Sequence, residues 1–505
     1  MNTRNERYLV RFPDPRRMAA NVFVGYPSTY SAGMSNLGYH FLFKGLRLNP
    51  YIRVERFFAD TAPLTLESGS RISSAGLIFF SVSYEEDYLN MVRILTKSGI
   101  PASRRDRGRK PLVIAGGTAP SANPFPVSEI ADLICIGEGE GILGAISGIL
   151  TETGSEDPDL LIRNIAGLEG VFIPDYPQER VTFSHPERIE EFPYSFAVSP
   201  DTAFGDTMLI ETGRGCPGSC TFCLAGSLYS PLRMISRERF IGQLSGVDGF
   251  PASVKKVGLV STAVAANPDF EEMVDYLLNN GIAPSFSSFR AQDIDEAAAA
   301  VIAGAETRSV ALAPESGSER ARSSLNKPVA DETFFRAASL LAAGGVKRFV
   351  IYLLTGYPGE DEAVIEETSV FMNKLSGAAG GARIEVHINA VVPKPWTPLQ
   401  FYPLPAENEL RRRAERLADT CRKYAVVKIK SVRSSLRQAI LSLGTEQVGK
   451  AVLEFGAGKA TWQKSLKKHG IDPSFIHSER RGGVWHRIEG PITEQALLDR
   501  YRKLM

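Results

Sequence analysis

The 505-residue chain lacks the long apolar stretches that a membrane protein or a secreted precursor requires. No segment approaches the ~18 uninterrupted apolar residues of a membrane-spanning helix. The opening MNTRNERYLVRFPDPRR has no apolar core of the kind that a signal peptide contains. Low-complexity runs and tandem repeats of fixed period are absent as well. We therefore expect a cytoplasmic protein that makes no contact with a membrane.

Cysteine is scarce, with five residues in the chain, and this number is odd. Cys216, Cys220 and Cys223 fall within eight residues, whereas Cys135 and Cys421 lie far away in the sequence. Disulfide frameworks use paired cysteines and belong to oxidising compartments. The pattern argues against a disulfide-stabilised fold and fits the reducing cytoplasm. We expect the two distant cysteines to be small hydrophobic residues of the core.

The net charge of +1 conceals an uneven distribution of charge along the chain. Residues 411–505 contain 21 Lys and Arg against 9 Asp and Glu, a net charge of +12, so that residues 1–410 carry −11. A basic segment can bind an anionic partner such as RNA, or it can be the solvated surface of helices. Both alternatives stay open, and RNA is a candidate partner of this segment.

Short apolar runs in residues 1–195 alternate with helix-like stretches such as NLGYHFLFKGL (36–46). The runs lie at 21–27, 76–84, 111–117 and 131–140, and they end in small residues. Strands that alternate with helices predict a parallel sheet covered by helices, with ligands beyond the carboxyl ends of the strands. We expect an α/β fold that begins with a doubly wound, Rossmann-like domain over residues 1–195. A Pro-rich stretch at 174–200 predicts the connection to the next domain.

A second domain is predicted over residues 200–405. Its strand candidates lie at 207–213, 254–262, 283–291, 307–316, 346–356 and 382–393. Helical stretches such as FEEMVDYLLNN (270–280) separate them, and the alternation predicts a (βα)6 partial TIM barrel. Chemistry in such barrels belongs to the loops that leave the strands. Residues 406–505 form the third expected region, which is basic and mostly helical.

The three clustered cysteines follow the first predicted barrel strand, in the sequence GRGCPGSCTFC. A structural zinc site normally takes four ligands, and no histidine lies between His185 and His387 to complete one. A redox-active disulfide needs only Cys-x-x-Cys and would leave Cys216 unexplained. Iron–sulfur clusters are held by cysteine thiolates at short spacings, and three cysteines leave one iron of a four-iron cluster open. The spacing favours a [4Fe–4S] cluster with Cys216, Cys220 and Cys223 as metal ligands.

The Cys-x3-Cys-x2-Cys motif after the first strand of a partial barrel resembles the defining motif of the radical S-adenosylmethionine (SAM) superfamily. The resemblance implies an oxygen-sensitive enzyme in which the amino and carboxylate groups of SAM chelate the fourth iron. A reducing partner such as flavodoxin or ferredoxin would supply an electron to the cluster. Cleavage of the sulfonium then yields a 5′-deoxyadenosyl radical, which abstracts a hydrogen atom.

The same resemblance assigns SAM contacts to residues on successive strands. In the family, the aromatic residue before the third cysteine lies near the adenine, and the second-strand turn (here GLVST, 258–262) lies near the methionyl amino group. A third-strand arginine can pair with the methionyl carboxylate, and the fourth-strand motif, here APESGSERARSSLNKP, faces the ribose. The positions implied are Phe222, Ser261, Ser288, Arg290, Glu315 and Ser316. The second strand departs from the family pattern because Ser261 and Thr262 supply hydroxyls but no carboxylate.

A doubly wound domain ahead of such a barrel resembles the cobalamin-binding class of this superfamily. The resemblance rests on IAGGTAPSANPFP (114–126) and DLICIGEGE (132–140), and glycines there would let a ligand approach the backbone closely. The cofactor contacts that it implies are Ser81, Ser83, Gly116 and Gly117. The histidine motif that supplies a lower cobalt ligand, Asp-x-His-x-x-Gly, is missing, and His40 is expected to be a half-exposed helix residue. Either cobalamin binds without a protein histidine, or the domain keeps the fold and has lost the cofactor.

Several reactions remain open at this point. If cobalamin binds, the resemblance implies methylation of a substrate that the sequence does not name. Without it, a methylthiotransferase-like or other radical modification, including one of RNA, becomes the prediction. An alternative from a different class is a non-catalytic iron–sulfur redox sensor. Lys394 and Trp396, in VVPKPWTPLQFYPL (391–404), are expected at the barrel mouth, either near the reaction or in a proline-stiffened exit loop.

Overall fold

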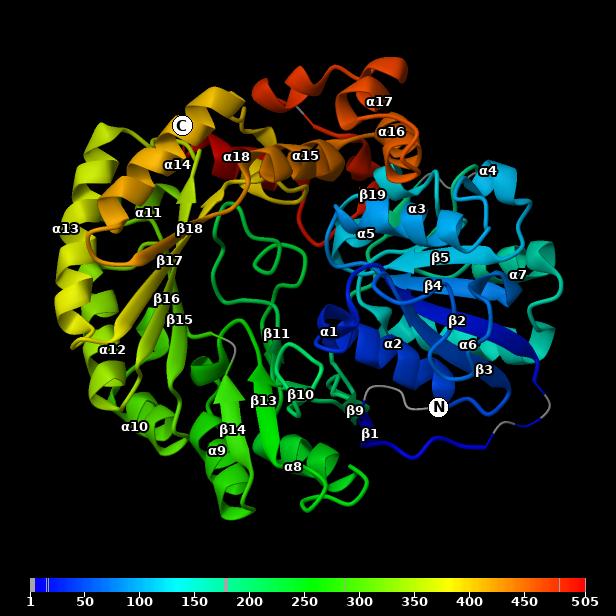
Figure 1. The fold of residues 1–505 in the computed structure, drawn as a ribbon, viewed down its shortest axis with the longest axis horizontal. Coiled ribbons are helices and arrows are strands. Elements are labelled where there is room, and N and C mark those ends of the chain that lie inside the picture. The colour runs from blue at the N-terminus through cyan, green and yellow to red at the C-terminus, as the bar shows by residue number, and fades with distance from the viewer. Residues whose placement is uncertain are drawn as a thin grey trace.

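The computed structural model describes residues 5–14, 16, 18–176, 180–286, 288–480 and 482–504. Figure 1 shows a helix-covered sheet built from the first part of the chain on one side and a curved barrel sheet on the other. C-terminal helices run between the two. Among the described helices, none has the length and apolar character needed to cross a membrane.

The first sheet has six strands, and the order β3-β2-β4-β5-β6-β7 places its switch point between β2 and β4. The strands are β2 (Ala20–Tyr26), β3 (Ile52–Phe58), β4 (Leu77–Ser81), β5 (Leu112–Gly116), β6 (Leu133–Cys135) and β7 (Val171–Phe172). All are parallel except β7, which runs antiparallel to β6. This arrangement confirms the predicted doubly wound fold. The predicted strands correspond to β2, β4, β5 and β6, whereas β3 was not predicted.

Helices cover both faces of this sheet. One face packs against α2 (Leu37–Arg47), α6 (Gly139–Thr153) and α7 (Pro158–Ile165). The other packs against α3 (Asp87–Lys97) and α5 (Thr118–Ala122), and the same core continues into α15 (Val432–Leu443), α16 (Glu446–Gly456) and α17 (Trp462–Lys468). The C-terminal region is therefore built onto the first sheet as well as onto the barrel.

The barrel contains the six predicted parallel strands, in two hydrogen-bonded groups, β10-β13-β14 and β15-β16-β17-β18. They are β10 (Met208–Glu211), β13 (Lys256–Val260), β14 (Ala283–Phe286), β15 (Ser309–Glu315), β16 (Arg348–Thr355) and β17 (Arg383–Ala390). The helices that follow them are α8 (Arg237–Ser245), α9 (Phe270–Asn279), α10 (Glu296–Gly304), α12 (Asp331–Ala343), α13 (Glu362–Ala378) and α14 (Glu407–Cys421). Figure 1 shows α12, α13 and α14 on the outer side of the sheet, so that its concave face looks toward the first sheet.

The C-terminal region is largely helical, but it also supplies two strands. β18 (Val426–Ile429) pairs in parallel with β17 and extends the barrel sheet beyond residue 405. β19 (Ile488–Glu489) pairs with β8 (Val181–Thr182), which lies in the predicted connection. Helix α18 (Glu494–Arg502) ends the chain. In the same connection, β9 (Ala197–Val198) pairs with β1 (Arg7–Tyr8).

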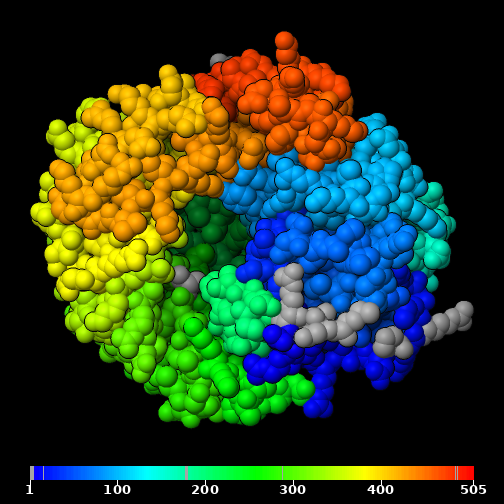
Figure 2. All heavy atoms as spheres, viewed as in Figure 1, coloured from blue at the N-terminus to red at the C-terminus, as the bar shows by residue number. Residues whose placement is uncertain are grey.

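Several basic residues after residue 410 are paired with carboxylates earlier in the chain. Arg413 bonds to Glu360 and Arg437 to Glu86, and Lys428 Nζ lies 2.5 Å from Glu385 Oε1. The opposite net charges of the two parts of the sequence thus meet at their interface. Figure 2 shows that the molecule is hollowed between the barrel half and the first region.

Candidate active site

The cysteine loop begins where β10 ends and is fixed by contacts from other strand ends. Thr262 Oγ1 donates a hydrogen bond to Gly215 O at 2.5 Å. Asn326 Nδ2 donates to the carbonyl oxygen of Ser219 at 2.8 Å and to its hydroxyl at 2.7 Å. The backbone N–H of Thr221 bonds to a carbonyl of the same segment that contains Asn326. The loops after β13 and β15 therefore hold the three cysteines in place.

The thiols of Cys216 and Cys220 approach a common point of the loop. A Cβ atom placed on Gly218 would lie 3.6 Å from Cys216 Sγ and 3.8 Å from Cys220 Sγ. Burial raises the pKa of Cys220 to about 11 and also raises the pKa of Cys223. Among the described residues, no three His, Cys, Asp or Glu side chains are arranged to hold a single metal ion. Three cysteines are one ligand short of a structural zinc site, and they leave one iron of a four-iron cluster open.

Two residues beside the loop, Asn326 and Lys327, were not identified in the sequence analysis. Lys327 Nζ lies 3.0 Å from Glu315 Oε1, and its positive charge opposes the effect of burial on the pKa of Cys220. Burial raises the pKa of Glu315, and this residue has a φ of +65° at the end of β15. Lys327 and Asn326 both belong to the quoted SSLNKP segment, whose resemblance drew attention only to Glu315 and Ser316.

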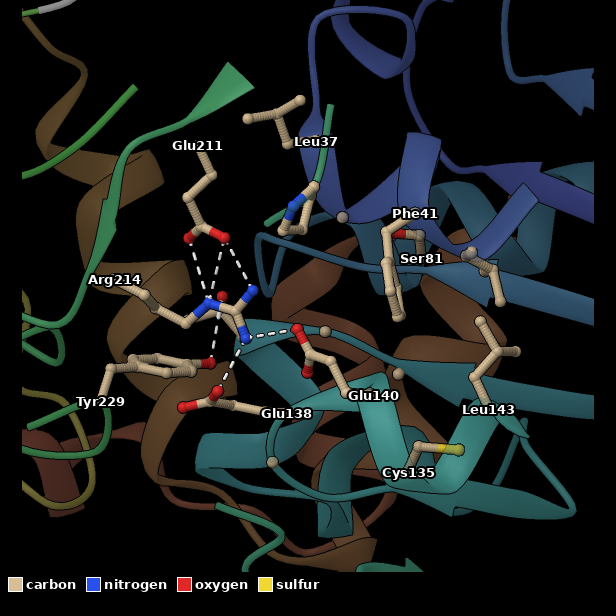
Figure 3. Close-up of a pocket in the computed structure, with 18 of the residues that line it drawn as sticks. Leu37, Phe41, Ser81, Cys135, Glu138, Glu140, Leu143, Glu211, Arg214 and Tyr229 are labelled. Carbon is tan, nitrogen blue, oxygen red and sulfur yellow. Dashed lines mark hydrogen bonds and ion pairs between the residues drawn. The ribbon is translucent and has the colours of Figure 1, made fainter. Parts of the chain in front are cut away.

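A cavity of about 560 Å³ lies between the carboxyl edge of the first sheet and the barrel. Its wall combines the ends of β4, β5 and β6 with the ends of β10 and β13 and the loop after β14 (Figure 3). The predicted residues that it brings together are Ser81, Gly116, Gly117, Ser261 and Ser288. A ligand in this cavity would touch both sheets at once.

One part of the cavity is apolar. It lies between α2, α6 and the first sheet and is lined by Phe41, Leu42, Phe79, Ile114, Ile142 and Leu143. Cys135, at the end of β6, also lines this wall, and burial raises the pKa of its thiol to about 12. The apolar part can accept a flat ring or a hydrocarbon chain.

The opposite wall of the cavity carries a network of charges around Arg214 (Figure 3). The guanidinium of Arg214 bonds to Glu138, Glu140 and Glu211, each at 2.7 Å. Glu138 also bonds to Arg233, whose Nη1 lies 3.1 Å from Glu138 Oε2. Burial raises the pKa of Glu211. Glu140 Oε2 is buried and has no hydrogen-bond partner among the described residues, so this wall keeps an acceptor for a ligand.

Other predicted residues lie outside this cavity. Ser83 Oγ accepts a hydrogen bond from Asn36 at 3.1 Å, and Ser316 Oγ accepts one from the Tyr357 hydroxyl at 2.9 Å. Phe222 packs against the core that the first sheet shares with the C-terminal helices.

Arg290 also lies outside the cavity, and its Nε is 3.3 Å from Asp293. Its Nη1 is buried without a hydrogen-bond partner among the described residues. Arg290 therefore keeps a donor for a ligand.

Position 117 requires a glycine for a reason other than the ligand approach expected from the sequence. Gly117 has a φ of +113°, and a Cβ atom there would lie 2.4 Å from the carbonyl oxygen of Val82. A Cβ atom on Gly116 would lie 3.3 Å from the Cβ of Cys135. Both glycines line the cavity, but the backbone of Val82 is so close that position 117 requires a glycine whether or not a ligand binds.

His40 is fully buried, so the prediction of a half-exposed residue is wrong. Its Nε2 lies 3.0 Å from Met34 O, and its Nδ1 accepts a hydrogen bond from the backbone N–H of Phe196. Burial lowers the pKa of His40 to about 4. The residue joins α2 to the segment before β10 and does not line the cavity.

Lys394 and Trp396 connect the barrel to the first region. The ammonium group of Lys394 bonds to Glu85, which is almost fully buried. Trp396 is buried, and its indole N–H donates to Ala122 O at 3.0 Å. These contacts favour the exit-loop alternative for this segment.

Comparisons with known proteins agree with this geometry. Residues 38–174 match the family model described as "Radical SAM proteins, N-terminal", and residues 210–372 match that of the "Radical SAM superfamily". The chain belongs to the radical SAM superfamily. It is therefore a radical SAM enzyme, and its radical SAM domain implies a [4Fe–4S] cluster and SAM. A non-catalytic sensor no longer fits.

Two solved structures with a similar fold are those of radical SAM enzymes that bind cobalamin. The radical SAM methyltransferase TsrM from Kitasatospora setae, solved with cobalamin and a [4Fe–4S] cluster, has a TM-score of 0.53 at 13% identity, over 76% of this chain and 74% of that one. The cobalamin-dependent SAM radical enzyme OxsB, solved with aqua-cobalamin and SAM, has a TM-score of 0.54 at 17% identity, over 90% of this chain and 62% of that one. At these identities the likeness shows a shared fold.

A curated relative covers nearly the whole chain. The uncharacterized protein MJ0966 of Methanocaldococcus jannaschii is 26% identical over 476 residues, which is 94% of this chain and 99% of the relative.

Proposed function

We propose that this radical SAM enzyme binds cobalamin in the cavity between its two sheets and methylates a substrate that remains to be identified. When bound, the cluster and SAM supply a 5′-deoxyadenosyl radical, and cobalamin supplies a methyl carrier. The observation that carries the proposal is the cavity itself, because one wall belongs to the first sheet and the other to the barrel.

The residues around the cysteine loop suit SAM. We assign three irons to Cys216, Cys220 and Cys223. We assign the methionyl carboxylate to Arg290, whose buried Nη1 has no hydrogen-bond partner among the described residues. We assign the remaining SAM contacts to Phe222, Ser261, Ser288, Glu315 and Ser316. Buried donors and strand-end hydroxyls of this kind orient a cofactor and exclude water from it.

The cavity suits cobalamin in its distribution of polarity. Cobalamin carries an aromatic base on its nucleotide tail and amide groups around its ring. The apolar part between α2 and α6 fits the base, and the free acceptor of Glu140 fits an amide N–H. We assign further contacts to Ser81, Gly116 and Gly117. No histidine is among the described residues that line the cavity, which favours binding without a protein histidine.

Binding of hydroxocobalamin tests the proposal directly. Gly139, the first residue of α6, lines the cavity, and a Cβ atom there would meet only Phe41 at an ordinary 3.6 Å. Gly148 on the same helix is exposed and has no atom within 4 Å of such a Cβ atom. After gel filtration, we expect corrin absorbance with the unmodified protein and with Gly148→Trp, and none with Gly139→Trp.

The iron content should be equal in all three proteins. Loss of corrin from the unmodified protein would contradict the proposal. A cobalamin-free radical reaction, such as a methylthiotransferase-like modification, would then become the leading candidate. Formation of 5′-deoxyadenosine from SAM after anaerobic reduction with dithionite should persist in either case, because it depends on the cluster.

A further inference from the structure

The concave face of the barrel sheet carries a carboxylate–imidazole pair that the assignments above leave unused. Side chains alternate between the two faces along a strand. Ile351 and Val386 belong to the barrel core beneath the outer helices, so Tyr352, Glu385 and His387 point to the concave face. Figure 1 shows this face directed toward the first sheet.

His387 lies on the face of the barrel sheet opposite the helices, and Figure 2 shows that the molecule is hollowed between the barrel half and the first region. Its side chain is 30% exposed, whereas that of Glu385 is 8% exposed. His387 pairs in register with Tyr352 on β16 and with Lys428 on β18. The imidazole therefore lies on a wall that a substrate in the hollow can reach.

The pair has a defined geometry. His387 Nε2 lies 2.6 Å from Glu385 Oε1, and Lys428 Nζ lies 2.5 Å from the same oxygen. The ring of Tyr352 meets the imidazole edge-on, at 5.3 Å between centroids. Hydrogen bonds from His387 and Lys428 lower the pKa of Glu385 to about 2, so Glu385 is a carboxylate at neutral pH and accepts both.

The hydrogen bond selects the tautomer of His387. A neutral imidazole that donates from Nε2 keeps a lone pair on Nδ1. No described residue is hydrogen-bonded to Nδ1 of His387. The charged and titratable groups that face the ring are Glu385 on its own strand, Tyr352 on β16 and Lys428 on β18. The next lysine, Lys430, is bonded to Tyr84.

We propose that His387 accepts a proton from the substrate, with Glu385 as its positioning residue, and that the substrate is methylated at an atom that bears an ionisable hydrogen. This inference rests on the proposed methyl transfer. It names the substrate class as one with a nitrogen, oxygen or sulfur acceptor. Methyl transfer to such an atom is a polar step that does not consume the 5′-deoxyadenosyl radical, whereas methylation of an aliphatic C–H bond needs a radical to remove a hydrogen atom.

The overall step balances as follows. A lone pair of the acceptor atom forms the new bond to the methyl carbon, and the bond between that carbon and the sulfonium sulfur of SAM breaks with its electron pair left on sulfur. The proton of the acceptor moves to His387 Nδ1, and the X–H electron pair stays on the acceptor. Glu385 remains ionised and stabilises the imidazolium.

The tautomer is measurable without the substrate. In the full-length protein labelled with ¹⁵N in its six histidines, His387→Gln identifies the signal of His387 by its loss. We expect a protonated Nε2 and an unprotonated Nδ1 near pH 8. In Glu385→Gln, the preference for the Nε2–H tautomer should weaken, because an amide oxygen is a weaker acceptor than a carboxylate. An Nδ1–H signal in the unmodified protein would overturn the proposal.

A transfer assay tests the catalytic role. Extracts of cells from which the gene for this protein has been deleted are incubated anaerobically with the enzyme and SAM that carries a deuterated methyl group, and labelled products are followed by mass spectrometry. His387→Ala should lower the rate of labelling by roughly 10²–10⁴-fold, and added imidazole should restore part of it. Lys374→Gln, at an exposed residue of α13, is the matched control.

The two measurements separate failure of this inference from failure of methyl transfer. Labelling by His387→Ala at the rate of the unmodified protein would overturn the role of His387 while methyl transfer stands. If the unmodified protein transfers no label, methyl transfer itself fails, and the tautomer still decides whether His387 can accept a proton.

Discussion

Cys135 lies in the wall of the cavity, whereas Cys421 is fully buried in the barrel core, and both are outside the cysteine loop. We expect anaerobically reconstituted protein to hold about four irons per chain. Replacement of Cys216, Cys220 or Cys223 by Ala should remove most of this iron because each thiolate holds one corner of the cluster. Cys135→Ala and Cys421→Ala should keep it. A full cluster in the triple variant, by iron analysis and absorbance, would contradict the assignment.

His40 makes the stability of the protein depend on pH. Its folded-state pKa is about 4, below its ordinary value of 6.5, so the unfolded chain binds a proton more readily between these values. Stability should therefore fall as the pH drops from 6.5 to 4, by about 3 kcal/mol. Urea unfolding at several pH values measures this slope. It should flatten in His40→Gln and persist in His469→Gln, and an equal slope in both variants would refute the assignment.

At the residue scale, the sequence reveals sites whose ligands are close together in the chain. The spacing of the three cysteines is local, and it was sufficient to predict the cluster. The contact between Arg214 and Glu138 joins residues 76 positions apart, on different sheets, and nothing in either local sequence specifies it. Lys327 and His387 were missed for the same reason. A turn brings Lys327 to its partner, and strand register sets the neighbours of His387.

Helix α14 carries three consecutive arginines that are not equivalent. Arg413 bonds to Glu360 at 3.3 Å, and Glu360 is 3% exposed. Arg412 is 58% exposed and, among the described residues, bonds only to its own helix. Arg413→Ala should lower the free energy of unfolding by about 2 kcal/mol because it leaves a buried carboxylate without its cation. Arg412→Ala should change it by less than about 0.5 kcal/mol. Equal effects in denaturant titrations would contradict this difference.

Because these arginines are paired with carboxylates, any RNA-binding surface of this region would have to use other basic residues. Lys459, Lys464 and Lys467 are exposed, and no ion pair involving them is found among the described residues. If the C-terminal region binds RNA, reversal of these three charges should weaken binding and reduce the slope of log K against log salt by about 2. Filter binding with total cellular RNA at several salt concentrations tests this. Salt-independent binding would leave the surface as a solvated helical face.

At the element scale, the strands that follow a simple pattern were predictable. All six barrel strands of the prediction are present, because apolar runs and helical stretches alternate regularly there. β3, with the sequence IRVERFF, was missed because its charged residues interrupt the apolar pattern. Arg56 is nevertheless fully buried, and it pairs at 2.6 Å with Glu6 from another part of the chain. β18 was missed because it is a strand through its pairing with β17, which its own sequence does not indicate.

Glu138 connects the two halves of the molecule at the scale of the whole chain. Its side chain is 1% exposed and bonds to Arg214 and Arg233, which are 14% and 10% exposed. Glu138→Ala should destabilise the protein by about 3–5 kcal/mol, chiefly because Arg233 loses its carboxylate partner, whereas Arg214 keeps Glu140 and Glu211. The midpoint of guanidinium unfolding should fall accordingly. Glu156→Ala, at a side chain 94% exposed, should leave the midpoint unchanged, and an equal shift would contradict the role of Glu138.

The pairing of β8 with β19 also has a consequence in time. Val181 is synthesised before its strand partner Ile488, which is 307 residues later in the chain. On the order of 15–60 s of synthesis therefore separates the two residues. Ser184, two residues beyond β8, accepts the backbone N–H of Glu138 in the cavity wall. While the nascent chain is still growing, that wall lacks the support of its last strand, so the wall of the cavity is completed only near the end of synthesis.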